Sequence, residues 1–441
     1  MGAGGNMRMA PDIRVCGDEI YALAAALYPI CRSITGNGVR ETLRLLGRHV
    51  DLTVVEVPSG TAVFDWTVPK EWNLRAAHIT SSRGERVVDV ARSNLHVVNY
   101  STPVRAKMSL GELRPHLHAL PAQPDLIPYR TTYYEPSWGF CLAHAQLMDL
   151  PEDTYDVVID ASLEVGSLTY GEYFKRGETD EEILLSSHIC HPSLANDNCS
   201  GLAVLALLAA ELSRRRTQYS YRFLFAPGTI GAIAWLAHNQ QGAAKRIKHG
   251  LIVSNVGDGG GPTYKKSRRG NALVDRAAAH VLAHSGLEQQ RILDYSPYGY
   301  DERQYCSPGF DLAVGSLQRS CWGTFPQYHT SADNLDFIRP EHLARSLGLV
   351  SEILDVLEGD VRYRNLSPFC EPQLGKRGLY DTTSGKQSQA YRIGLLWVLN
   401  LSDGAHSLLD IAERSGLPFS AISEAAERLR VAGLLEPVSP G

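Results

Sequence analysis

Long apolar runs are scarce in this sequence of 441 residues. The longest extends over Gly201–Ala210, about half of the ~20 residues that a membrane-spanning helix requires. The first ten residues, MGAGGNMRMA, contain no apolar signal core, and Asn6 stands where N-myristoylation requires serine or threonine. These absences argue against a membrane span and a lipid anchor.

Clustered cysteines and an excess of positive charge are also missing. Eight cysteines are spread along the chain without a C-x-x-C pair, which argues against a disulfide framework and a structural zinc knuckle. Reduced thiols are typical of the cytoplasm, and we expect the protein there. The formal net charge is -5. Phosphate binding needs a basic face, so nucleic acid is not expected to be the main partner.

Regions of the chain differ in composition and in the spacing of their apolar residues. Residues 64–164 contain short β-branched and aromatic segments between prolines, a pattern that predicts a β-rich inserted subdomain. Two amphipathic helices are expected over 18–31 and 40–50, and strands and helices alternate from residue 182 onward. Alternation of this kind predicts an α/β core, assembled from residues 1–63 and 165–380, around a mostly parallel sheet.

The last region, residues 387–441, follows a helix–turn–helix pattern with Gly416 and Pro418 in the turn. It contains four arginines, no lysine and six acidic residues, which gives a charge of -2 before any histidine. A DNA-reading helix is expected to be basic. This region is therefore predicted to serve interaction or docking rather than DNA binding.

The segment SSHICHPSLANDNCSG, residues 186–201, is the most informative in the chain. His188 ends an apolar strand, and Asp197 follows nine residues later, at the mouth of an apolar helix. An imidazole and a carboxylate brought together in this way are zinc ligands. Asp197 alone is equally well explained as a helix cap, but His188 and His191 beside it favour a metal site.

Four ordered motifs carry a family resemblance: SSHICHPSLANDNCSG, APGTIGAIAWL, YDERQYCSPGFDL and YHTSADNLDFI. Together they resemble the aminopeptidase-like family of bacteria, which is related to the M28-type zinc peptidases. Members of that family have a small inserted domain and a C-terminal winged helix. The resemblance implies a three-layer α/β/α fold of the phosphorylase/hydrolase type and a zinc (Zn2+) cofactor.

Carried over residue by residue, the M28-type pattern matches His188, Asp197 and His329 to metal ligands. Asp258 falls near the place of a further carboxylate ligand, although an aspartate in the glycine-rich turn GDGGG also has a purely local explanation. The pattern departs at Gly228 and Thr229, where M28-type enzymes have two glutamates. One is the general base and the other a ligand of the second zinc, so a single zinc is expected.

The missing base must come from elsewhere if the protein is an enzyme. Asp301 and Glu302, in the loop YGYDERQYC, and His191 are the candidates, although Asp-Glu-Arg is also an ordinary solvated loop. Further residues are candidates for substrate binding, namely Arg303 and Arg319 for a substrate carboxylate and Tyr328 for an oxyanion. Each of these has a purely structural alternative.

The function predicted from these residues is zinc-dependent hydrolysis of an amide bond in an amino-acid-containing small molecule or a peptide. The alternative is a catalytically altered zinc-binding protein that serves as a ligand-recognition or regulatory module, because the two glutamates are missing. The sequence leaves the oligomeric state open, with a homo-oligomer among the alternatives.

Overall fold

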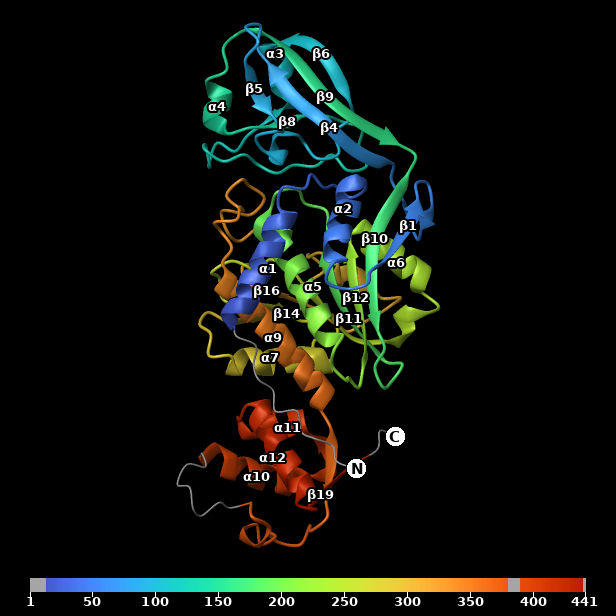
Figure 1. Cartoon of the computed structure of the whole chain (residues 1–441), viewed down its shortest axis with the longest axis vertical. Helices are drawn as coiled ribbons and strands as arrows, with labels where there is room; N and C mark the ends of the chain where they lie inside the picture. Colours follow the sequence, from blue (N-terminus) through green and yellow to red (C-terminus); the bar gives the residue numbers. More distant parts are fainter. Residues whose placement is uncertain (1–12, 380–388, 439–441) are drawn as a thin grey trace. The chain divides into compact units, whose positions relative to one another are not determined.

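The computed structural model describes residues 13–379 and 389–438. The chain divides into two compact units: the first comprises Met1–Gly270 and Arg291–Gly348, and the second comprises Asn271–Gln290 and Leu349–Gly441 (Figure 1). Among the helices in the described ranges, none combines the length and the apolar character needed to cross a bilayer.

An eight-stranded sheet forms the centre of the first unit, in the order β1-β10-β12-β11-β13-β16-β14-β15. Its four middle strands, β12, β11, β13 and β16, are parallel, and antiparallel neighbours flank them. In this spatial order the bounds are Thr53–Pro58, Ser167–Lys175, Ser220–Ala226, Glu182–His188, Ile247–Val253, Val314–Gln318, Thr263–Lys265 and Arg291–Leu293. The predicted α/β core with a mostly parallel sheet is confirmed.

Strand β11 is buried along its whole length, as its apolar residues Ile183, Leu184 and Leu185 predict for the middle of a parallel sheet. Helix α5, Gly201–Leu212, follows it and packs on β11, β12 and β13. Helices α1, Ile13–Leu27, and α2, Asn37–Leu46, lie together with α5 on one side of the sheet (Figure 1). Helix α6, Ile230–Asn239, follows β12 and contacts β10.

A second sheet lies in the stretch predicted to be β-rich. Its four strands are antiparallel in the order β5-β4-β9-β6, with bounds Arg86–Asp89, Glu71–Thr80, Thr154–Glu164 and Val104–Ser109. Strand β9 alternates buried and less buried residues, which is typical of a sheet with one face against a core. Not every β-branched segment of this stretch is a strand: NLHVVNY, residues 94–100, begins with a 3-10 turn over Asn94–His96, capped by the Ser93 side chain.

The second unit contains helix α7, Leu273–His284, and the winged-helix elements. The latter are helices α10, α11 and α12, over Gln389–Leu401, Leu408–Ser415 and Phe419–Val431, and a sheet in the order β18-β17-β19. Its strands span Asp403–Ser407, Arg362–Asn365 and Leu435–Pro437, so one strand precedes residue 387. Ser407 and Gly416 cap α11 at its two ends.

The predicted domain boundaries stay predictions, and those calls that fall on residues 1–12, 380–388 and 439–441 lie outside the described residues. Helix boundaries differ from the expected ones by a few residues: the second helix begins at Asn37 rather than residue 40. Residues Asn37, Gly38 and Val39 continue the helix because the chain reverses earlier, at Gly36, whose φ is 96°.

Candidate metal centre

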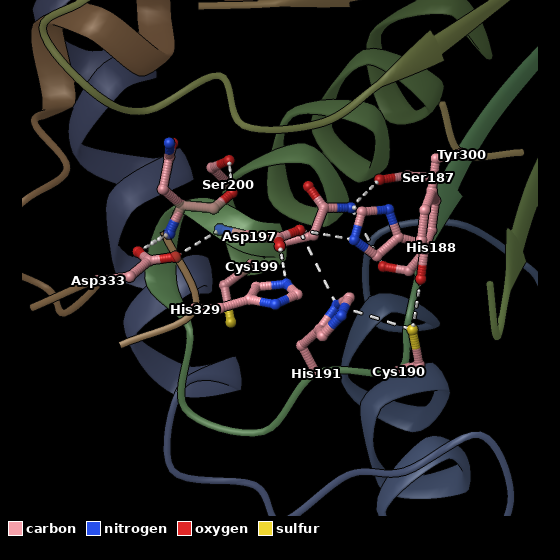
Figure 2. Close-up of polar contacts among 12 residues, drawn as sticks. Ser187, His188, Cys190, His191, Asp197, Cys199, Ser200, Tyr300, His329 and Asp333 are labelled. Atoms are coloured by element: carbon pink, nitrogen blue, oxygen red, sulfur yellow. Dashed lines mark hydrogen bonds and ion pairs between the residues drawn. The ribbon is translucent and has the colours of Figure 1, made fainter. Parts of the chain in front are cut away.

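The candidate site lies where β11 ends and the turn before α5 begins. His188 is the last residue of β11, and Asp197 lies in the tight turn Ala195–Ser200. Both are almost fully buried, at 2% exposure each. The Nε2 atom of His188 lies 2.7 Å from Oδ1 of Asp197 (Figure 2). Strand and helix therefore bring together an imidazole and a carboxylate that are nine residues apart in the sequence.

Two further imidazoles surround the same carboxylate (Figure 2). His329 Nε2 lies 3.1 Å from Oδ2 of Asp197, and His191 Nδ1 lies 3.9 Å from Oδ1. The ring centroids of His188 and His191 are 5.0 Å apart, and those of His191 and His329 are 5.2 Å apart. The structure thus places His188, Asp197 and His329 together, as predicted, and adds His191, which was predicted as a base.

The turn that carries Asp197 is held by the motif that carries His329. Asp333, four residues after His329, accepts hydrogen bonds from the backbone N–H groups of Asn196 (2.6 Å) and Asp197 (3.0 Å). Ser200 Oγ donates to the Asn196 carbonyl oxygen at 2.6 Å. The YHTSAD segment therefore contacts Asp197 twice, at its carboxylate through a histidine and at its backbone through an aspartate.

Asp258 does not join this group, and its placement does not support the predicted ligand role. Its carboxylate accepts hydrogen bonds from Asn196 Nδ2 (2.8 Å), from the Gly260 backbone N–H (2.6 Å) and from Ser320 Oγ (2.6 Å). These donors occupy both carboxylate oxygens. Asp258 instead positions Asn196, the residue before Asp197, and so supports the site from outside.

Tyr300 is a site residue that the sequence reasoning missed. Its ring centroid lies 4.4 Å from that of His188, and its hydroxyl lies 3.1 Å from Cys190 Sγ. A Cβ atom at Gly228 would lie 2.2 Å from the Tyr300 ring. The tyrosine ring therefore fills the space that a side chain at position 228 would need, at the place where M28-type enzymes have a glutamate.

The remaining predicted residues fall into different environments. Glu302 forms a buried ion pair with Lys265, 2.9 Å from Oε1 to Nζ, and accepts the Tyr300 N–H, so a catalytic role does not fit it. Arg303 is exposed, whereas Arg319 is buried and its Nε and Nη1 atoms have no hydrogen-bond partner among the described residues. Tyr328 stacks on the His329 ring at 3.9 Å.

Asp301 is buried at 1% exposure, and no described residue hydrogen-bonds its Oδ1 atom. Burial raises its pKa to about 7, against the opposing effect of His188. Burial also raises the pKa of Asp333 to about 8 and lowers that of His191 to about 3. For Asp197, burial favours the neutral acid, but the three surrounding imidazoles outweigh it and hold the pKa well below the usual value.

A pocket of about 290 Å³ opens onto these side chains. Its lining combines residues of the core and of the β-rich insert. They are Ile34, Trp66, Tyr129, Arg130, Thr131, Tyr133, Tyr134, His191, Gly228, Thr229, Tyr300 and His329. A molecule in this pocket would therefore lie against His191 and His329, with aromatic side chains around it.

The donor set fits a zinc ion. One ligand atom each from His188, His191 and Asp197 lie within 4.8 Å of one another. Imidazole nitrogens and a carboxylate oxygen are the ligands that zinc takes in proteins. Asp197 is buried and the three imidazoles around it favour its charged form, which is the form that binds zinc.

Comparison with known proteins agrees with this fold. A family model described as "Domain of unknown function (DUF4910)" matches residues 21–360, and a winged helix-turn-helix model matches residues 361–437. A Clostridium acetobutylicum protein, named as a candidate polysaccharide biosynthesis protein with an aminopeptidase-like domain, is 51% identical over 423 residues. The match covers 96% of this chain and 97% of that protein.

Solved structures give the same result. The crystal structure of a candidate peptidase from Clostridium acetobutylicum is 50% identical, with a TM-score of 0.92 and 97% of each chain covered. A Bacillus subtilis zinc aminopeptidase has a TM-score of 0.58 at 12% identity, covering 79% of this chain and 96% of its own. A Shewanella amazonensis M28 peptidase precursor has a TM-score of 0.53 at 13% identity, covering 78% and 95%.

The two distant structures share only the fold, whereas the family model and the Clostridium relative span most of the chain. The protein therefore belongs to the family described as "Domain of unknown function (DUF4910)", whose core here has the fold of the M28 aminopeptidases and is followed by a winged helix.

Proposed function

We propose that this protein is a zinc-dependent hydrolase that cleaves an amide bond in an amino-acid-containing small molecule or a peptide. The observation that carries the proposal is the buried Asp197 carboxylate, which faces imidazole nitrogens at 2.7, 3.1 and 3.9 Å. The M28-like fold of the chain supports it. These side chains lie at the carboxyl end of a parallel strand and line a pocket. In open α/β sheets, active sites usually lie at the carboxyl ends of the strands.

In this proposal His188, His191 and Asp197 hold one zinc ion. Three protein ligands leave a fourth position for water or substrate, as catalytic zinc sites do. His329 contacts the other carboxylate oxygen of Asp197 and orients it. When bound, zinc supplies a Lewis acid and lowers the pKa of a bound water to about 7. His191 is then a ligand, whereas the sequence analysis named it as one of three candidate bases.

We assign the proton acceptor to Asp301. Its neighbour Tyr300 lines the pocket, its carboxyl is buried, and its Oδ1 atom has no described partner. A pKa near 7 suits a general base at neutral pH. Glu302 is excluded from this role because Lys265 and the Tyr300 N–H bind its carboxylate.

The test combines zinc content with turnover of a panel of amides. We expect about one zinc per chain in protein purified without chelators, and loss of that zinc in His188→Asn, His191→Asn and Asp197→Asn. His249→Asn is the control, because His249 lies in the first half of β13, away from the carboxyl end of the sheet. Asp301→Asn should keep zinc and lose roughly 10²–10⁴-fold in kcat.

The second candidate function is zinc binding without catalysis. The Tyr300 ring favours it, because the ring fills the space that a glutamate at position 228 would need. Zinc bound at the predicted ligands without turnover of any amide would support this alternative. The name of the Clostridium relative points to polysaccharide biosynthesis, so N-acylated amino sugars belong in the panel beside peptides. Zinc that persists in all three ligand variants would refute both candidates.

A further inference from the structure

The pocket at the candidate metal centre is lined by basic side chains and, within the described residues, by no acidic ones. None of its twelve lining residues, all within the described ranges, is an aspartate or a glutamate. The charged or titratable groups among them are Arg130, His191 and His329, together with the phenols of the tyrosines. An aminopeptidase substrate has a free α-ammonium group, which needs an anionic partner when it leaves water. This lining offers none.

Three of the carboxylates near the pocket already have hydrogen-bond or ion-pair partners. Asp197 faces three imidazoles, Asp333 accepts two backbone N–H groups, and Glu302 pairs with Lys265. Asp301 is buried and does not line the pocket. A zinc ion beside Asp197 would add positive charge. An ammonium group in this pocket would therefore lose its hydration, meet cationic neighbours and find no carboxylate among the described residues of the pocket lining.

Arg130 is the cation that the pocket presents to a substrate. It is exposed, and its guanidinium forms no ion pair with any of the described residues. Its backbone is fixed, because its carbonyl oxygen accepts the Asn99 N–H at 2.8 Å. Guanidinium groups bind carboxylates through two parallel hydrogen bonds, so a free arginine at a pocket rim is a carboxylate receptor.

The chain beside Arg130 is fastened to the loop of the metal centre. The Tyr129 N–H donates to the His329 carbonyl oxygen at 2.7 Å, and the Ser331 N–H donates to that of Ile127 at 2.9 Å. The Tyr129 ring stands edge-on to His191 at 5.1 Å and to His329 at 5.0 Å. Arg130 therefore has a set position relative to the candidate zinc ligands, although it belongs to the β-rich insert.

We infer that the substrate is an N-acylated amine bearing a carboxylate, and that Arg130 selects it by binding the carboxylate. This inference rests on the proposed hydrolase function. Water adds across the amide: its oxygen joins the acyl carbon with loss of one proton, the C–N bond breaks, and the nitrogen takes a proton. The products are a carboxylic acid and an amine, and transfer of the acid's proton to the amine gives a carboxylate and an ammonium group. The aromatic residues Trp66, Tyr133 and Tyr134 form the apolar wall for the rest of the substrate.

The test uses two probes with the same side chain and opposite charge, N-acetyl-L-phenylalanine and L-phenylalanine amide. Each contains one amide bond. Their dissociation constants are measured by calorimetry on the zinc-loaded full chain, and their turnover by release of products. We expect the acetylated acid to bind at least tenfold more tightly. Arg130→Gln should weaken its binding about tenfold to a hundredfold, and Arg130→Glu should reverse the preference.

Arg83→Gln is the matched control, since Arg83 is an exposed arginine of the same insert that does not line the pocket. Tighter binding of the amide, or an acid affinity that Arg130→Gln leaves unchanged, would overturn the inference. Either outcome with turnover of a probe leaves the hydrolase function standing. Selective, Arg130-dependent binding of the acid without turnover of any amide would support the recognition and overturn hydrolysis.

Discussion

At the scale of single residues, the Tyr300 ring occupies the space that a side chain at position 228 would need. This contact explains why a glycine, and not a glutamate, stands at position 228. The Tyr300 ring packs against the His188 ring, and its hydroxyl contacts the Cys190 thiol. Its backbone N–H is held by Glu302, which is itself anchored by the buried Lys265. The ring has little freedom to move aside, so residue 228 must lack a side chain.

The first prediction concerns this pair. Gly228→Ala should lower the free energy of unfolding by roughly 1–3 kcal/mol, because its Cβ would overlap the tyrosine ring. In a Tyr300→Ala background the same substitution should cost less, with a coupling energy of at least ~0.5 kcal/mol in a double-mutant cycle. Urea unfolding measures all four proteins. Gly309→Ala, where a Cβ meets open space, is the control, and equal costs in both backgrounds would contradict the explanation.

Asp333 supports a second prediction at this scale. Its carboxylate accepts two backbone N–H groups of the Asp197 turn, so Asp333→Asn should misplace Asp197 without removing a ligand. We expect zinc affinity to fall about 10–100-fold, as when a supporting residue of a metal site is lost. Competition with a chelating dye measures it. Asp336→Asn is the control, since Asp336 is exposed three residues on, and an equal loss there would refute the role.

At the scale of elements, Arg40 joins a helix to two strands. From α2 it pairs with Glu56 of β1 and with Glu71 of β4. The hydrogen bond from Arg40 is the main cause that lowers the pKa of Glu71 from 4.5 to about 2. The ion pair therefore stabilises the folded protein in full above about pH 4.5, and this contribution is lost as the pH falls towards 2.

Glu71→Gln should accordingly reduce the free energy of unfolding at pH 7, and the difference from wild type should shrink between pH 4.5 and 2. Urea unfolding at several pH values measures that difference. Glu41→Gln is the control: Glu41 pairs with Arg44 on the exposed side of α2, and such pairs contribute about 0–1 kcal/mol. A difference that does not change with pH would show that Glu71 acts through packing.

Helix α12 presents no free positive face. Arg430 pairs with Glu427 at 2.7 Å, and Arg428 lies 3.7 Å from Glu424. DNA affinity comes largely from cations that replace the counterions of phosphates. We therefore expect no mobility shift with random duplex DNA at low salt. A shift that disappears in Arg428→Gln/Arg430→Gln would show that these ion pairs open for DNA and would contradict the prediction.

At the scale of the whole molecule, the proposed zinc ion would join the end of β11 to the turn before α5, through His188 and Asp197. Its ligand Asp197 also contacts His329 of a late loop, 132 positions away. A ligand bound only by the folded state stabilises it by about 4 kcal/mol at 1,000 times its dissociation constant. Removing zinc should therefore lower the unfolding temperature by several degrees.

Scanning calorimetry of chelator-treated protein, with and without added zinc, measures this effect. Asp197→Asn should lose the response to zinc, and magnesium should not replace zinc because it prefers oxygen ligands in octahedral geometry. An equal rise in unfolding temperature for Asp197→Asn and wild type would place the zinc elsewhere.

The sequence by itself determined the class of fold and the first part of the site. Alternating apolar strands and helices were enough to predict the parallel sheet, because burial and period are local properties. His188 and Asp197 could be predicted as neighbours because only nine residues separate a strand end from a helix start. His329 was predicted only through its resemblance to a known motif.

Only the tertiary structure decided the roles of the other side chains. Asp258 accepts a hydrogen bond from Asn196, 62 positions away in the chain. Glu302 pairs with Lys265 at a separation of 37 positions, and Tyr300 contacts Cys190 at a separation of 110. Residue type limits what a side chain can bind, but the order of strands in the sheet and the paths of the loops decide which partner it meets. For that reason Tyr300 emerged as a site residue, and His191 as a candidate ligand instead of a candidate base, only when the strand ends were seen together.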